Sequence, residues 1–70
     1  MLGEQEQYFY ETAKTYLDNA RSAWDQKRAA RAQDYLREAR YWAYKVPERF
    51  TKGDFQDNLR ELELKITRGY

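Results

Sequence analysis

The residues whose types and spacing offer chemistry are three carboxylates in the last third of the chain. Asp54, Asp57 and Glu61 are three and four residues apart, so they share one face if the segment is helical. Carboxylate oxygens are the ligands that Mg²⁺ and Ca²⁺ prefer. Acidic residues in the first turns of a helix also stabilise the positive end of its dipole. We favour this second interpretation and expect no metal and no other cofactor.

Other groups that could support catalysis are few. The chain contains no His and no Cys, which excludes the common nucleophile–base pairs and zinc sites. Its one serine, Ser22, falls on the polar side of a predicted helix. Asp34 and Glu38 are one helical turn apart, but Arg31 and Arg37 are close enough in sequence to neutralise them. General acid–base catalysis needs a cleft that shifts pKa values, so we predict that the protein is not an enzyme.

Length and composition indicate a single small folded domain, residues 1–70, with a thin core. Hydrophobic residues make up 41% and charged residues 36% of the chain, which is typical of a folded protein. Leu, Ile and Val are scarce, so aromatic rings packed against Ala are expected to form the core. No apolar stretch approaches the roughly 20 residues of a membrane helix. The acidic start does not resemble a signal peptide, and with no Cys we expect a cytoplasmic protein.

Apolar residues recur at helical spacing in three segments, about 5–25, 29–46 and 54–68. The stripes consist of Phe9, Ala13, Tyr16, Ala20 and Ala23, then Ala32, Leu36, Ala39, Ala43 and Val46, then Phe55, Leu59, Leu62 and Ile66. Tyr8 and Tyr10 flank the first stripe and are expected to widen the core. Strands have little support because β-branched residues are rare. The predicted fold is all-α, a three-helix domain made of an antiparallel hairpin and a C-terminal helix.

The junction between the first two segments determines this arrangement. Continuing the first stripe past Trp24 would place Lys27, Arg28 and Arg31 on the buried face. Three adjacent cations are not buried together without partners. We therefore predict a tight turn near 26–29, although no Gly marks it. The alternative is one long bent helix in an oligomer.

The ends of the other helices have clearer signals. Pro47 disfavours helix at the residue before it and ends the second segment. Asp54 follows Gly53 and is expected to be the N-cap of the third helix. Gly69 stands where a C-terminal glycine cap belongs. Glu61 and Lys65 form an i, i+4 pair in the favoured order.

Residues 16–43 resemble one tetratricopeptide-type helical hairpin. That family places small residues where its two antiparallel helices touch, and Ala20, Ala32 and Ala39 match these positions. Leu36 matches the large apolar position between the last two. Small side chains allow the helix axes to approach closely, while larger neighbours fill the flanks.

The segment also departs from that family. Lys27 stands where the family has Gly in its turn, and Tyr44 stands where it has Pro. Pro47 comes three residues later than the family's Pro. The match covers less than half of the chain, and one repeat alone does not make a stable array. The resemblance implies peptide or protein binding.

The face of the second helix opposite its apolar stripe has the composition of an interaction surface. A helical residue advances about 100°, which places Arg37, Arg40, Tyr41 and Tyr44 on that side. Tyr and Arg are enriched among the residues that dominate interfaces. Leu64, which points away from the third stripe, completes the candidate partner-binding residues. The third helix could instead cover this face. We predict a non-enzymatic protein-interaction module, adaptor or inhibitor-like, that binds a protein partner or a second copy of itself.

Charge distribution suggests an alternative function. The net charge is −3 in residues 1–19, +5 in residues 20–52 and −1 in residues 53–70. A basic middle section is compatible with a small nucleic-acid-binding protein. Phosphates would contact Arg21, Lys27, Arg28, Arg31, Arg37 and Arg40, and bases would stack on Tyr41 or Tyr44. Asp25, Asp34 and Glu38 interrupt the basic run and weigh against this alternative.

Overall fold

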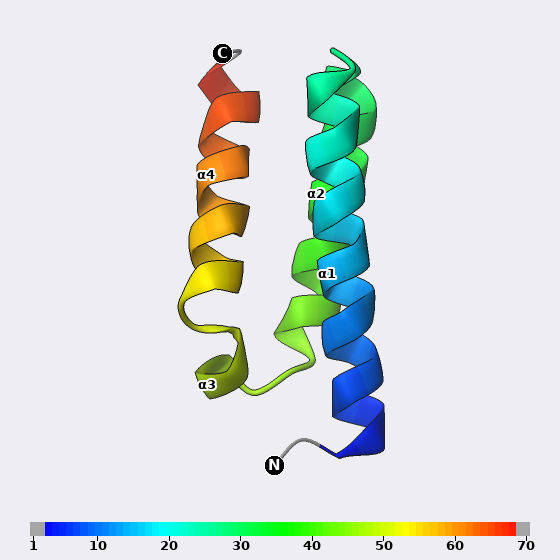
Figure 1. Ribbon diagram of the computed structural model, residues 1–70, viewed down its shortest axis with the longest axis vertical. Coiled ribbons are helices and arrows are strands. Elements are labelled where there is room, and N and C mark those ends of the chain that lie inside the picture. Colours follow the sequence, from blue (N-terminus) through cyan, green and yellow to red (C-terminus); the bar gives the residue numbers. More distant parts are fainter. Residues whose placement is uncertain (1–2, 69–70) are drawn as a thin grey trace.

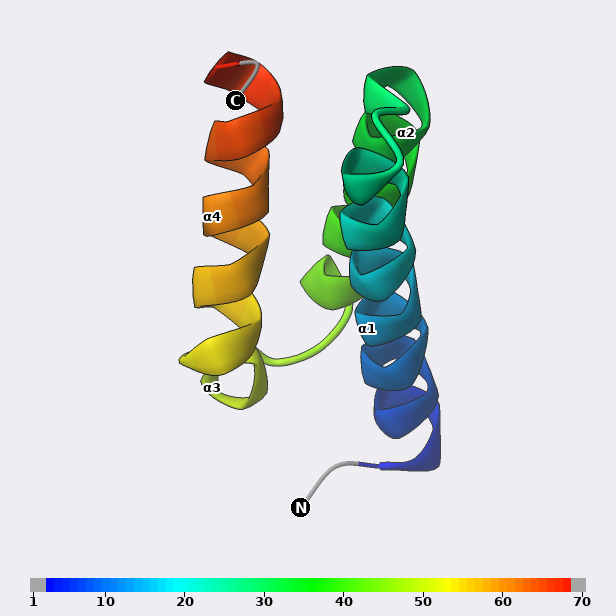
Figure 2. The ribbon, with the colours of Figure 1, turned by 45° about the horizontal axis from the view of Figure 1, so that its top comes forward.

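The computed structural model describes residues 3–68, which form four helices and no strand. The helices are α1 (Glu4–Asp25), α2 (Ala29–Tyr44), α3 (Glu48–Thr51) and α4 (Asp54–Arg68). Helices α1 and α2 run antiparallel and side by side, and α4 stands alongside them (Figures 1 and 2). The short α3 connects the end of α2 to the start of α4. The prediction of an all-helical fold is therefore confirmed.

A hydrogen-bonded turn separates α1 from α2 at residues 26–28. The Arg28 N–H donates to the Ala23 carbonyl at 2.8 Å, and the Lys27 N–H donates to the Trp24 carbonyl at 2.9 Å. These two bonds form a Schellman motif, which ends a helix with a residue in the left-handed region. Lys27 is that residue, with a φ of +61°. The backbone thus turns inside the predicted range without a glycine, and residues 3–45 do not form one continuous helix.

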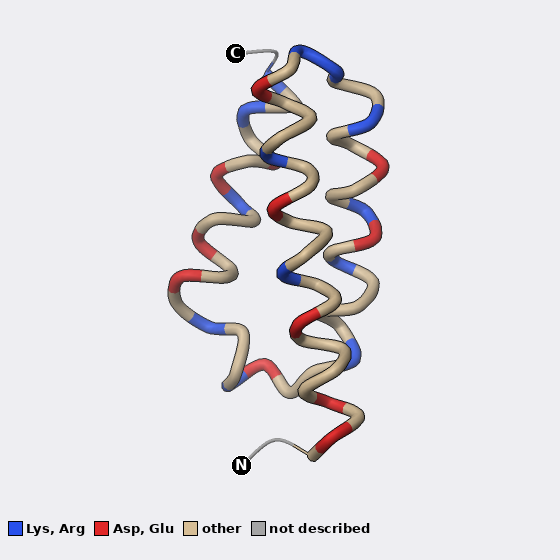
Figure 3. The backbone as a smooth tube through the Cα atoms, turned by 45° about the vertical axis from the view of Figure 1, so that its right-hand side comes forward, with Lys and Arg blue, Asp and Glu red and all other residues tan. Residues whose placement is uncertain are grey.

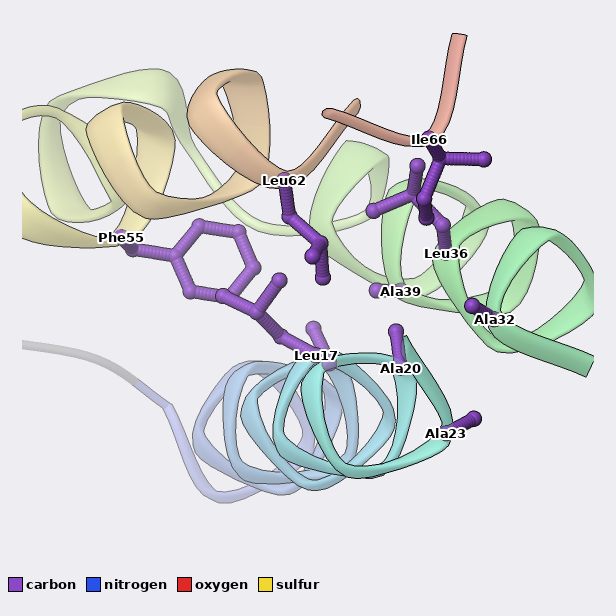
Figure 4. Packing of buried hydrophobic residues seen from close by; sticks show 10 residues of the cluster. Leu17, Ala20, Ala23, Ala32, Leu36, Ala39, Phe55, Leu62 and Ile66 are labelled. Atoms are coloured by element: carbon purple, nitrogen blue, oxygen red, sulfur yellow. The ribbon is translucent and has the colours of Figure 1, made fainter. Parts of the chain in front are cut away.

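Alanines form the contact between α1 and α2. Four of them are fully buried, with 0% exposure: Ala13, Ala20, Ala32 and Ala39. Leu17 and Leu36 belong to the same cluster, and Figure 4 shows them with Ala20, Ala32 and Ala39 between the helices. Aromatic pairs flank this contact, Tyr16 with Tyr35 at 6.2 Å between ring centroids and Phe9 with Trp42 at 5.5 Å. The expected packing of aromatic rings against Ala is found at the flanks, whereas among the described residues the buried core combines Ala with Leu, Ile and Val and includes one aromatic side chain, Phe55.

Helix α4 closes the third side of the core. Phe55, Leu62 and Ile66 are buried, and Figure 4 shows them directed toward the side chains of α1 and α2. The Phe55 ring meets the Tyr10 ring edge-on at 5.7 Å, so Tyr10 widens the core as predicted. The same prediction is wrong for Tyr8, which is 61% exposed. The difference arises because α4 covers the Tyr10 side of α1 and leaves Tyr8 at the surface.

Helix α2 ends at Tyr44, two residues before the predicted end. The Lys45 N–H donates to the Trp42 carbonyl at 3.1 Å, and the Val46 N–H donates to the Ala43 carbonyl at 3.0 Å. Both bonds span three residues instead of the four of an α-helix. This tightening is common in a last helical turn. Because Val46 precedes Pro47 it avoids the helical conformation, and its buried side chain fixes the turn.

The single turn of α3 is not predicted by the sequence, because four residues are too short to show a periodic pattern. Thr51 holds it in place. Its buried hydroxyl donates to the Glu48 carbonyl at 3.1 Å and accepts from Gln56 Nε2 at 2.9 Å. These bonds tie α3 to the first turn of α4.

Gly53 directly precedes α4 and has a φ of +92°, a conformation that L side chains rarely adopt. The Asp57 N–H donates to the Gly53 carbonyl at 2.9 Å, so Gly53 occupies the capping position. Asp54 is the first residue of the helix, and its predicted role as the N-cap is wrong. The predicted cap at Gly69 lies outside the described residues.

Candidate partner-binding site

The outward face of α2 is open. Tyr44 is 91% exposed and Tyr41 is 56% exposed, although tyrosine rings usually lose most of their surface to neighbours. Arg37 and Arg40 are exposed on the same face. Helix α4 packs on the adjoining side of α2 and does not cover the two rings. The face that the sequence singles out is therefore available to a partner.

A shallow hollow of about 420 Å³ lies on this face. Its lining is cationic and aromatic, with no carboxylate: Arg37, Arg40, Tyr41, Tyr44 and Lys45. We call it the tyrosine–cation shelf. Four of the five predicted site residues meet here, and the fifth lining residue, Lys45, was missed by the sequence reasoning. Its spacing of four residues from Tyr41 is the signal that could have identified it.

Lys45 stretches across two aromatic rings. Its Nζ lies 4.9 Å from the centroid of the Tyr41 ring and 5.7 Å from that of Phe9. Cations over aromatic faces are attracted by the negative face of the ring, by about 0.5–1 kcal/mol at exposed sites. These contacts hold the lysine against the shelf and leave its charge without a carboxylate partner among residues 3–68.

Aromatic packing supports the shelf from below. The Trp42 ring lies 5.3 Å from Tyr41, 5.5 Å from Phe9 and 6.3 Å from Tyr8, measured between centroids. Its buried Nε1–H has no acceptor among the described residues, so ring contacts and packing against the core position it. The N-terminal part of α1 thus braces the C-terminal part of α2, and the exposed tyrosines stand on a packed base.

A second, larger hollow lies between the end of α2, α3 and α4. It has a volume of about 660 Å³, and we call it the apolar groove. Its apolar lining consists of Ala43, Val46, Pro47, Phe55 and Leu59. The polar lining consists of Arg40, Tyr44, Glu48, Thr51, Gln56, Arg60 and Glu63. The groove was not predicted, because it depends on α3 turning the chain away from α2.

Arg40 and Tyr44 line both hollows and form the ridge between them. The Arg40 guanidinium lies 2.8 Å from the Glu63 carboxylate of α4. The two side chains are 57% and 35% exposed, so solvent screens the pair and its contribution is about 0.2–1 kcal/mol. The ion pair mainly fixes the position of the ridge.

Leu64 is not part of this site. It is 46% exposed on α4, but it lines neither the tyrosine–cation shelf nor the apolar groove. Helical spacing places it nearly opposite Leu62 and Ile66, away from α2. The structure therefore does not bring this predicted residue together with the other four, and an isolated exposed Leu is common on protein surfaces.

The basic residues fall into two separated groups. Arg28 and Arg31 line a small hollow at the α1–α2 turn, whereas Arg37 and Arg40 line the shelf. The helical rise separates Arg28 from Arg40 by about 18 Å. Lys and Arg are concentrated at the turn end of the hairpin, with acidic residues interspersed along the helices (Figure 3). The six cations considered for nucleic-acid binding thus do not line one common hollow.

Among residues 3–68 no group of three acidic side chains is arranged to hold a metal ion, Asp54, Asp57 and Glu61 included. Glu61 pairs with Lys65 at 3.5 Å, as predicted. None of the described helices combines the length and apolar character needed to cross a bilayer.

Comparisons with protein families, with curated proteins and with solved structures find no match to this chain. The geometry of the shelf and the groove is therefore what supports a functional proposal.

Proposed function

We propose that this chain is a non-enzymatic protein-interaction module, adaptor or inhibitor-like, whose partner binds the outward face of α2. The observation that carries the proposal is the pair of exposed rings, Tyr41 and Tyr44, in a hollow whose lining holds three cations and no carboxylate, although one of the cations, Arg40, pairs with Glu63 at its edge. Tyr and Arg provide large contact areas with polar tips, and few residues of this kind supply most of the binding energy of an interface.

We propose that the unit that binds the partner is a hairpin of α1 and α2 within one chain, with α4 packed against it. Close contact through Ala20, Ala32 and Ala39 supports this, and it agrees with the tetratricopeptide-type resemblance of residues 16–43. In such a unit α4 acts as the cap that an isolated hairpin requires. In a rigid hairpin the outward face of α2 is already ordered before binding. Little conformational entropy is then lost when the partner binds, which favours affinity.

Affinity purification from the native host tests the proposal. The bait is the full chain, and the variants are the double substitution Tyr41→Ala/Tyr44→Ala and, as a matched control, Leu64→Ala. All three substitutions remove exposed side chains and should leave the fold intact. We expect specific partners to be lost with the double variant and retained with the control.

Sedimentation of the purified chain at micromolar concentration tests self-association through the same face. A dimer that dissociates in the Tyr41→Ala/Tyr44→Ala variant would identify the partner as a second copy. A monomeric wild type whose captured proteins are the same with and without the two tyrosines would refute the proposal.

A further inference from the structure

The tyrosine–cation shelf and the apolar groove are adjacent and chemically different. The shelf has three cations and no carboxylate, whereas the groove has an apolar floor that includes the buried side chains of Val46 and Phe55. The volume of the groove, about 660 Å³, falls within the range of about 300–1,000 Å³ typical of ligand pockets. A ligand that filled both hollows would need an apolar part and an anionic part next to each other.

The cations of the shelf differ in whether a carboxylate pairs with them. Arg40 already pairs with Glu63. Arg37 and Lys45 have no carboxylate partner among residues 3–68, and Lys45 rests on aromatic rings. These two cations lie beside an exposed tyrosine and have no carboxylate partner of their own. They therefore attract an anion and favour binding modes that place its negative charge next to them.

We propose, on the basis of the proposed function, that the two hollows bind a short acidic segment of a partner protein that carries a large apolar side chain. The apolar side chain enters the groove, the segment crosses the ridge at Tyr44, and its carboxylates pair with Arg37 and Lys45. The apolar side chain then contacts the apolar lining of the groove, and the carboxylates contact the cations of the shelf. Neither hollow alone is enclosed enough to hold a ligand firmly.

Charge argues against the two other occupants. A second copy that docks its own shelf about a two-fold axis would bring Arg37, Arg40 and Lys45 toward the same cations, and like charges in close contact are unfavourable. A nucleic acid that extended from the shelf into the groove would meet two carboxylates, Glu48 and Glu63, as well as Arg60, and its phosphates would leave the apolar floor without a partner. A peptide that keeps its carboxylates on the shelf and places an apolar side chain in the groove matches both linings.

Selection from a phage-displayed library of random 12-residue peptides tests this inference. The enriched peptides are synthesised, labelled and titrated by fluorescence anisotropy against the wild type and three variants. Arg37→Glu/Lys45→Glu reverses the charge at two positions of the shelf, and we call this variant the reversed shelf. Arg21→Glu/Arg28→Glu makes the same change in net charge away from it. Arg37→Lys/Lys45→Arg retains the charges. Circular dichroism verifies that each variant is folded.

We expect enriched peptides that combine acidic residues with a large apolar residue. Their affinity should fall about tenfold or more with the reversed shelf, change less than about twofold with the matched control, and be retained with the charge-preserving variant. Substituting the apolar residue of the peptide by Ala should weaken binding to a similar degree.

Three outcomes would overturn the inference, and they differ in whether they also contradict the proposed function. Neutral or basic peptides that lose binding only with Tyr41→Ala/Tyr44→Ala would refute the acidic partner and leave the proposed function standing. Peptides indifferent to every change on the shelf, or no enrichment at all, would count against both. A 12-nucleotide single-stranded DNA that binds more tightly than the peptides, and is lost with the reversed shelf, would reassign the surface to nucleic acid.

Discussion

Lys27 shows how much one backbone conformation determines in this fold. The residue adopts a φ of +61° so that the chain can reverse between α1 and α2. For a residue with a Cβ atom the left-handed region costs about 1 kcal/mol, and glycine avoids that cost. The hydrogen bonds of the Schellman motif and the alanine contact beyond it outweigh this strain.

The first prediction follows from this strain. Lys27→Gly should raise the free energy of unfolding by about 0.5–1 kcal/mol, because the relief of strain exceeds the extra entropy that glycine gives the unfolded chain. Urea denaturation followed by circular dichroism measures the change. Lys27→Ala should have little effect, since Ala has the same Cβ atom. A less stable Lys27→Gly variant would show that the turn is not held in the left-handed conformation.

A second prediction at the residue scale concerns the ridge. A double-mutant cycle with Arg40→Ala and Glu63→Ala should give a coupling energy of about 0.2–1 kcal/mol at low salt, because both side chains are partly exposed. The coupling should decline as salt screens the pair. Thermal unfolding at two salt concentrations measures it. A coupling energy well above this range would mean that the pair is more buried than the structure shows.

At the scale of the elements, the alanine contact determines how closely α1 and α2 approach. Ala39 has 0% exposure, so a larger side chain there would force the helix axes apart. Ala30 lies on the same helix but is exposed in its first turn. The two positions differ in burial and share the same residue type and helix, which makes them a matched pair.

The third prediction uses that pair. Ala39→Leu should lower the free energy of unfolding by about 1–3 kcal/mol through overpacking, whereas Ala30→Leu should change it by less than about 0.5 kcal/mol. Chemical denaturation of both variants provides the comparison. Equal effects at the two positions would contradict close packing of the helices through small side chains.

The all-helical class and the long helices could be predicted from the sequence, for physical reasons that differ between elements. The spacing of Ala and aromatic residues identified the long helices, because a buried stripe requires that spacing. The run of cations at 27–31 located the turn, because unpaired charges are not buried together. The four residues of α3 could not be predicted, since their position depends on the tertiary bonds of Thr51.

At the scale of the whole molecule, the site was only partly predictable. Helical geometry placed Arg37, Arg40, Tyr41 and Tyr44 together, because they share one helix. Leu64 was assigned to the same surface because it points away from the apolar stripe of its helix, and the structure places it outside both hollows. The apolar groove depends on the path of the chain from α2 through α3 to α4, which no local pattern encodes.

The overall shape gives a protein of this size long exposed faces. The described chain has principal extents of 37 × 18 × 14 Å, so its helices offer long faces relative to a thin core. Two sides of α2 are used to pack against α1 and α4, and the third side carries the exposed tyrosines. The central claim is that this third side is where a partner binds.

Photo-crosslinking in cells of the native host tests that claim most directly. Benzoylphenylalanine replaces Tyr44 in one strain and, as a control, Asp18 on the exposed face of α1 in another. We predict a discrete crosslinked product with the probe at position 44 and none with the probe at position 18. Equal crosslinking at the two positions, or none at position 44, would contradict the assignment of the partner-binding face to α2.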